Sequence, residues 1–150
     1  MKVNLRKPIS YSYSWIGKKI TKAKQTFKPK DTVKIDYWDL WSLDISLAQV
    51  IRPALVAFSK VNYSYGTVDV EDLPEHTALF TDLEKWQWIV SEMIWAFEKI
   101  ADPHYDNEFF VKSEFAEFGL EYNSQAAKVV EDRINNGLRL FGKYYRALWT

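Results

Sequence analysis

The strongest constraint on the fold is a helical pattern that begins at Thr81. Thr81 followed by Glu84 is a capping box, in which each side chain bonds the backbone N–H of the other residue. Pro103 cannot continue a helix and closes the pattern. Between these points the apolar residues recur at helical spacings of three and four: Leu83, Trp86, Val90, Met93, Phe97 and Ile100. The sequence therefore predicts an amphipathic helix between Thr81 and Pro103.

Two other stretches have the same periodicity. The first starts at Asp39, with Asp36 or Asp39 as N-cap, and contains Pro53, which we expect to kink or split the helix. Its stripe is Leu40, Leu43, Leu47, Val50, Ile51, Ala54, Phe58 and Val61. The second follows a break near Asn123 and runs to the C-terminus. Its stripe is Ala127, Val130, Ile134, Leu138, Phe141, Tyr145 and Leu148, with Gly137 and Gly142 allowing close helix approach.

A further helix is predicted to begin at Ser113, and residues 62–81 read as a loop. The fold class we expect is mostly α: a bundle of about four helices preceded by an extended arm. We place the boundary after residue 34, with a basic aromatic arm over 1–34 and a helical domain over 35–150.

Charge sets the arm apart from the rest of the chain. The formal net charge is zero, but residues 1–34 hold ten of the twenty Lys and Arg residues and one of the twenty acids. Such asymmetry suggests an arm that docks on its own acidic body or reaches an anionic partner. The candidate nucleic-acid or partner contacts in the arm are Tyr11, Tyr13, Trp15, Lys18 and Lys19.

Composition excludes several classes of function. With no cysteine and only two histidines, thiolate catalysis, Cys-ligated zinc and disulfides are ruled out. No phosphate-binding glycine loop or nucleophile elbow is present, so we expect neither an enzyme nor a cofactor. Asp102, His104, Asp106 and Glu108 alternate along a loop, but they lack the pattern of a calcium site and read as a solvated turn, so we expect no metal. The sequence shows neither a membrane span nor a secretory signal, which indicates a cytoplasmic protein.

Two tryptophans stand off the apolar stripe of the central predicted helix. Trp88 and Trp95 project almost opposite that stripe, beside Glu92 and Lys99. Three interpretations remain open: a helix buried on two sides, a subunit interface rich in aromatic residues, or a shelf on which planar ligands stack.

The C-terminal predicted helix has a cationic row opposite its stripe. Arg139, Lys143 and Arg146 share one face, with Tyr144 and Trp149 nearby. The row is either a solvated flank that suits the negative end of the helix, or a phosphate site, since guanidinium groups bind phosphate oxygens in pairs. In the second case Tyr144 would stack on a base.

Three segments together resemble a group of small uncharacterised proteins encoded by tailed bacteriophages. They are Asp39–Ala48 (DLWSLDISLA), Glu92–Glu98 (EMIWAFE) and Arg133–Trp149 (RINNGLRLFGKYYRALW). The resemblance covers most of residues 36–149 but not the arm. It implies a phage accessory protein in a host cytoplasm and carries no catalytic residues with it.

The function we expect is sequestration of a small anionic nucleotide-type ligand in counter-defence, by a protein that forms a homo-oligomer. Trp88, Trp95, Tyr144, Arg139, Lys143 and Arg146 are the expected ligand contacts. Two alternatives stay open: a nucleic-acid-binding protein that uses the basic arm, and a structural module or one that blocks a host protein.

Overall fold

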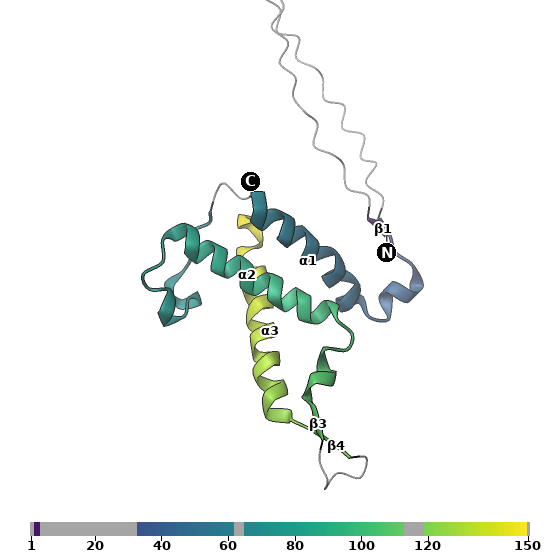
Figure 1. Ribbon diagram of the computed structural model, residues 1–150. Helices are drawn as coiled ribbons and strands as arrows, with labels where there is room; N and C mark the ends of the chain where they lie inside the picture. The colour runs from purple at the N-terminus through teal and green to yellow at the C-terminus, as the bar shows by residue number, and fades with distance from the viewer. Residues whose placement is uncertain (1, 4–32, 62–64, 113–118, 150) are drawn as a thin grey trace, which may run out of the picture. The chain divides into compact units, whose positions relative to one another are not determined.

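A computed structural model describes residues 2–3, 33–61, 65–112 and 119–149 of the 150-residue chain. It confirms a mostly helical protein. Three α-helices lie in these ranges, where about four were expected: α1 (Leu43–Val61), α2 (Asp82–Ala101) and α3 (Ser124–Tyr144) (Figure 1). The chain forms two compact units, Met1–Trp41 and Ser42–Thr150, so the division falls seven residues after the predicted one.

The first unit contains a two-stranded sheet and a short helix. Strand β1 (Lys2–Val3) pairs antiparallel with β2 (Val33–Lys34), and the 3₁₀-helix η1 (Tyr37–Leu40) follows. The predicted contacts Tyr11, Tyr13, Trp15, Lys18 and Lys19 lie outside the described residues.

Helix α2 begins and ends where the sequence predicts. The Thr81 hydroxyl accepts a hydrogen bond from the Glu84 N–H at 3.3 Å, and the Glu84 carboxylate accepts one from the Thr81 N–H at 2.7 Å. The capping box is thus confirmed. Asp102 caps the other end directly before Pro103.

The second unit is organised around α2, which packs against both α1 and α3 (Figure 1). The interpretation of a helix buried on two sides is therefore confirmed for α2. Burial extends beyond the predicted stripe to Ile89, Glu92 and Ala96. Gly137 of α3 lies against this second side: a β-carbon built on it would be 2.4 Å from the Ala96 β-carbon. Gly142, predicted to do the same, has open space around it.

Helix α1 faces α2 with a stripe that matches the predicted one only in part. Its buried residues are Ala48 and Leu55, and Ile51 and Phe58 pack partly against the core. Several members of the predicted stripe are exposed instead: Leu40, Leu43, Leu47, Ala54 and Val61. Ile51 and Phe58 of the predicted stripe do pack on the core, and the rest of the prediction was wrong because α1 carries apolar residues on two of its sides. Pro53 lies inside α1 and does not split it.

Helix α3 buries Ile134, Gly137, Leu140 and Tyr144, and Asn123 caps its start by accepting a hydrogen bond from the Ala126 N–H at 3.0 Å. Leu138 and Tyr145, both expected in the core, are exposed. Before α3, strands β3 (Phe110–Lys112) and β4 (Leu120–Tyr122) form an antiparallel hairpin. The helix predicted from Ser113 is thus replaced by a strand in its described part, while residues 113–118 lie outside the described residues.

Short 3₁₀-helices complete the second unit. They are η2 (Val70–Asp72), η3 (Glu75–Thr77), η4 (Tyr105–Phe109) and η5 (Tyr145–Ala147). The first two lie in the stretch between α1 and α2 that was predicted to be a loop. No helix in the described part of the chain is both long and apolar enough to cross a membrane.

Candidate functional site

The predicted cationic row meets an acidic residue from a distant part of the chain. Asp72 of η2 has a side chain only 3% exposed, and it forms ion pairs of 2.6 Å with both Arg139 and Lys143 of α3. Lys143 also pairs with Asp69 at 2.6 Å. Two of the three predicted phosphate ligands are therefore engaged by carboxylates of the protein itself.

Tyr144 belongs to the same network. Its hydroxyl donates a 2.6 Å hydrogen bond to Asp72 and accepts one from the Asp69 N–H at 3.0 Å. Its ring is buried and meets Trp86 edge to face, with centroids 5.8 Å apart. Tyr144 is thus part of the core, and its ring is covered by neighbouring residues. Arg146 is exposed and has no ion-pair partner in the described ranges.

The network shifts the proton affinities of its members. Burial alone would raise the pKa of Asp72, but hydrogen bonds from Lys143, Tyr144 and Arg139 outweigh it and lower the pKa to about 2. The pKa of Lys143 is raised by its bonds to Asp69 and Asp72. Burial, together with the bond to Asp72, raises the pKa of Tyr144. These directions keep Asp72 and Lys143 charged and Tyr144 protonated at neutral pH, and the cluster joins η2 to the C-terminal end of α3.

The two off-stripe tryptophans have different surroundings. Trp88 is half-buried and packs against the main core cluster. Trp95 is also half-buried, but it lies beneath a cation of α3: the Arg133 Cζ is 3.9 Å from the centroid of its ring. The same guanidinium binds the buried carboxylate of Glu92 through two hydrogen bonds of 2.7 and 3.0 Å. Glu92 thus fixes the cation that covers one face of Trp95.

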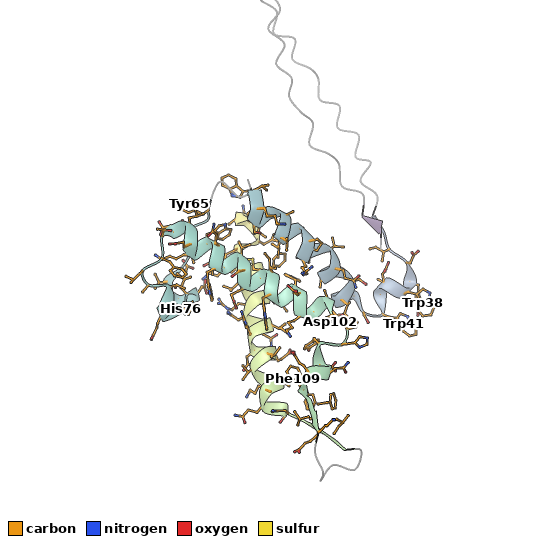
Figure 2. The ribbon with its side chains drawn as sticks, viewed as in Figure 1. Trp38, Trp41, Tyr65, His76, Asp102 and Phe109 are labelled. Atoms are coloured by element: carbon orange, nitrogen blue, oxygen red, sulfur yellow. The ribbon has the colours of Figure 1, made fainter. Side chains whose placement is uncertain are left out.

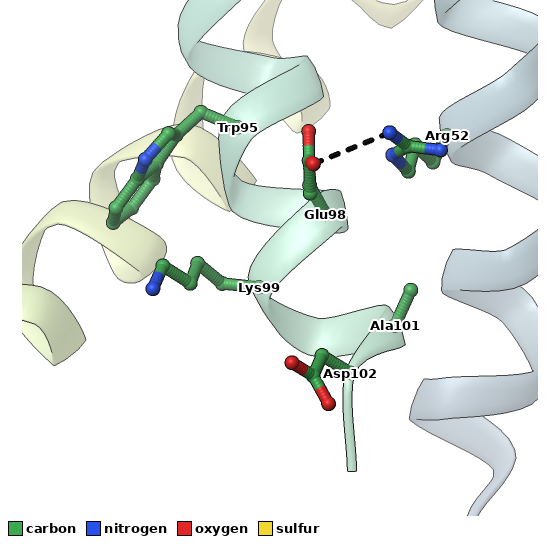
Figure 3. A pocket seen from close by; sticks show the side chains of 6 residues that line it. All are labelled: Arg52, Trp95, Glu98, Lys99, Ala101 and Asp102. Carbon is green, nitrogen blue, oxygen red and sulfur yellow. Dashed lines mark ion pairs between the residues drawn. The ribbon is translucent and has the colours of Figure 1, made fainter. Parts of the chain in front are cut away.

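Trp95 also lines an open cleft of about 520 Å³ between α1 and α2. Figure 3 shows Trp95 and Lys99 extending from one side of α2, while Glu98 turns toward Arg52 of α1. Ala101 and Asp102 complete the lining. The cleft therefore combines one aromatic ring with two cations and two carboxylates.

The charges of the cleft are only partly matched. Arg52 pairs with Glu98 at 3.3 Å, and Lys99 pairs with Glu108 at 2.7 Å. Oδ1 of Asp102 accepts a hydrogen bond from the His104 N–H at 2.9 Å. The Arg52 Nε is buried and has no hydrogen-bond partner. A buried N–H without a partner costs about 1–3 kcal/mol, so Nε is a donor for which an acceptor would be favourable.

Sequence reasoning found one residue of this cleft and missed another. Trp95 was singled out because it stands off the apolar stripe. Arg52 was not among the predicted site residues, although a cation inside the apolar run of residues 45–59 is the signal that could have identified it. Its closeness to α2 depends on how the two helices pack, which the periodicity does not give.

The predicted loop of alternating polar residues borders the cleft, because Asp102 belongs to both. In the described residues no group of three or more His, Asp or Glu side chains could hold a metal ion, and Asp102, His104, Asp106 and Glu108 form none. In the first unit, Tyr37, Trp38 and Trp41 are strongly exposed and contact one another at centroid distances of 5.1–6.2 Å (Figure 2). We call these three residues the aromatic cluster.

Comparison of this chain with protein-family models, with curated proteins and with solved structures gave no match.

Proposed function

We propose that this protein is a non-enzymatic binding protein that holds a small anionic ligand with a planar ring in the cleft between Arg52 and Trp95. The observation that carries the proposal is Arg52, which lines the cleft together with the indole of Trp95 and whose buried Nε has no hydrogen-bond partner. The volume of about 520 Å³ lies within the range of small-molecule sites.

Each side chain of the cleft has a role in this proposal. The planar ring of the ligand stacks on Trp95, on the face away from Arg133, because flat rings pack well on an indole. Arg52 and Lys99 bind the anionic group. The carboxylates of Glu98 and Asp102 accept hydrogen bonds from amino groups on the ring. Nucleotides match this set of anion, planar ring and amino donors.

The cleft replaces the phosphate site that the sequence suggested. Arg139 and Lys143 already have carboxylate partners, and a ligand phosphate would have to displace Asp72, which is almost fully buried. Arg52 and Lys99 also have carboxylate partners, but these partners, Glu98 and Glu108, have half-exposed side chains that a ligand can displace at less cost than the buried Asp72. For this reason we assign the anionic group to Arg52 and Lys99 and not to the C-terminal row.

The resemblance to phage proteins suggests a biological setting for such binding. A small phage protein without an enzymatic activity acts by binding its target and keeping it from other partners. We therefore propose that this protein sequesters a host nucleotide signal in antiviral defence. Isothermal titration with a panel of cyclic and linear nucleotides tests this function. Saturable heat with at least one of them supports it, and the absence of both heat and thermal shift across the panel contradicts it.

A second candidate function is the binding of single-stranded nucleic acid. The observation that favours it is the exposure of the aromatic cluster, since Trp38 and Trp41 are 72% and 69% exposed. They follow directly after the segment that holds ten cations and one acid. Aromatic platforms next to positive charge bind single strands by stacking and by phosphate contacts. This function predicts an affinity that falls steeply with salt concentration, which titration of a labelled oligonucleotide at several salt concentrations would measure.

A further inference from the structure

Helix α1 carries a second apolar stripe that lies outside the hydrophobic core cluster formed by the described residues. It consists of Leu43, Leu47, Val50, Ala54, Ala57 and Val61, and none of the six is buried. At about 100° per residue these positions lie along one line on the helix, roughly 100° away from the residues that pack on α2. The stripe extends over the whole length of α1 and contains no charged residue.

The spacing of the stripe is that of a coiled-coil seam. Its members alternate intervals of four and three residues, which is the pattern of the a and d positions of a heptad repeat. Pro53 is exposed and lies on the flank of the seam, so it is not one of the a and d positions. The stripe therefore suits a second helix better than an irregular peptide.

The order of side chains along the stripe fits pairing with the same stripe of a second copy that runs in the opposite direction. When two α1 helices run in opposite directions about a two-fold axis, Leu43 faces the partner's Val61 and Leu47 faces the partner's Ala57. Each layer then joins a larger residue to a smaller one. A parallel pair would instead place two leucines together at one end and two alanines together near the middle, which leaves the middle thinly packed.

Electrostatics agree with the same arrangement. In the antiparallel register, Ser46 on the flank of one helix lies opposite the partner's Lys60, and no like charges face each other. The helix dipoles also oppose each other favourably. A two-fold pair uses the same surface on both copies, as the self-complementary stripe requires.

We infer that the protein forms a homodimer in which the exposed stripe of α1 pairs with the same stripe of a second copy in antiparallel orientation. This interface is separate from the ligand cleft and does not depend on the proposed function. It also differs from the aromatic surface of α2 that the sequence suggested for oligomerisation.

Cysteine cross-linking tests the orientation, because the natural chain contains no cysteine. Leu47→Cys and Ala57→Cys chains are purified separately and then oxidised alone and as an equal mixture. The dimer predicts disulfide-linked pairs in the mixture that contain one chain of each kind, with little linkage in either chain alone. Linkage within each variant alone, or none in any sample, would overturn the antiparallel pairing.

Sedimentation measurements test the interface itself. Leu47→Glu places a charge in the seam and should weaken the dimer at least about tenfold, whereas Gln49→Glu, on an exposed position away from the seam, should not. The double variant Leu47→Glu/Ala57→Lys should recover the dimer, since opposite charges then meet in each such layer. A wild-type protein that is monomeric at roughly 100 μM overturns the inference.

Discussion

The Tyr144 hydroxyl donates a 2.6 Å hydrogen bond to Oδ2 of Asp72 and so joins the last turn of α3 to η2. Both residues are buried, and they are 72 positions apart in the sequence. The contact explains why a tyrosine in a cationic row is a core residue. It also fixes the segment before α2 against the helix that carries the row.

Replacement of Tyr144 by phenylalanine should lower the free energy of unfolding by about 1–3 kcal/mol, because the Asp69 N–H loses its acceptor and Asp72 loses a donor. Urea denaturation followed by circular dichroism measures the change. Tyr145→Phe is the matched control: that ring is 63% exposed, and its variant should stay within about 0.5 kcal/mol of the wild type. Equal losses in both variants would contradict the role of the hydroxyl.

Asp72 should make stability depend on pH in the acid range. Its pKa in the folded protein is about 2, below the ordinary value of 3.8. The stabilisation by its charge is therefore complete above pH 3.8 and is lost as the pH falls through 2. The loss amounts to about 2 kcal/mol. Denaturation curves between pH 5 and 2 should fall less steeply for Asp72→Asn than for the wild type, and parallel curves would refute the assignment.

Two glycines of α3 should respond to alanine in opposite ways. Gly137→Ala would place a β-carbon 2.4 Å from that of Ala96 and 2.9 Å from the Glu92 carbonyl oxygen, so we expect a loss of about 1–3 kcal/mol. Gly142 has open space, and alanine there should stabilise the helix by about 0.5–1 kcal/mol. Thermal denaturation of both variants checks the pair. A neutral Gly137→Ala would mean that α2 and α3 are farther apart than described.

The bond between Arg133 and Glu92 should matter for stability through the buried carboxylate. Arg133→Gln leaves Glu92 without its charged partner and should lower the free energy of unfolding by about 1–3 kcal/mol. A double variant, Glu92→Met/Arg133→Leu, removes both charges and should recover most of that loss. Chemical denaturation of the single and double variants measures both changes in the free energy of unfolding. A double variant that is less stable than the single one would contradict this role of the ion pair.

The helices of the second unit could largely be predicted from the sequence, because their limits are local. The Thr81–Glu84 capping box and Pro103 fix α2 without reference to the rest of the chain, and the double burial of α2 was one of the predicted alternatives. Helix α1 shows where periodicity fails: it has two apolar stripes, and the sequence does not say which of them packs on α2. Helix α3 and the turn after it show the same ambiguity. Tyr145 was predicted in the core and is exposed, whereas Tyr144 was predicted beside the cationic row and is buried.

The candidate site was less accessible to prediction, since its members come from different elements. The cationic row was recognised, but its partner Asp72 is 67 residues away from Arg139, and no local pattern connects them. Trp95 was recognised because it broke the stripe. Its neighbour Arg52 belongs to another helix, and only the packing of α1 on α2 brings the two into one cleft.

The most direct test of the proposed function is a titration that compares two arginines. With the nucleotide that gives the largest heat on the wild type, Arg52→Gln should weaken binding at least about tenfold, because a charged hydrogen bond is worth roughly 1.5–3 kcal/mol. Arg146→Gln removes an exposed cation of the C-terminal row and should leave the affinity unchanged. Loss of binding in Arg146→Gln with full affinity in Arg52→Gln would contradict the placement of the ligand between Arg52 and Trp95.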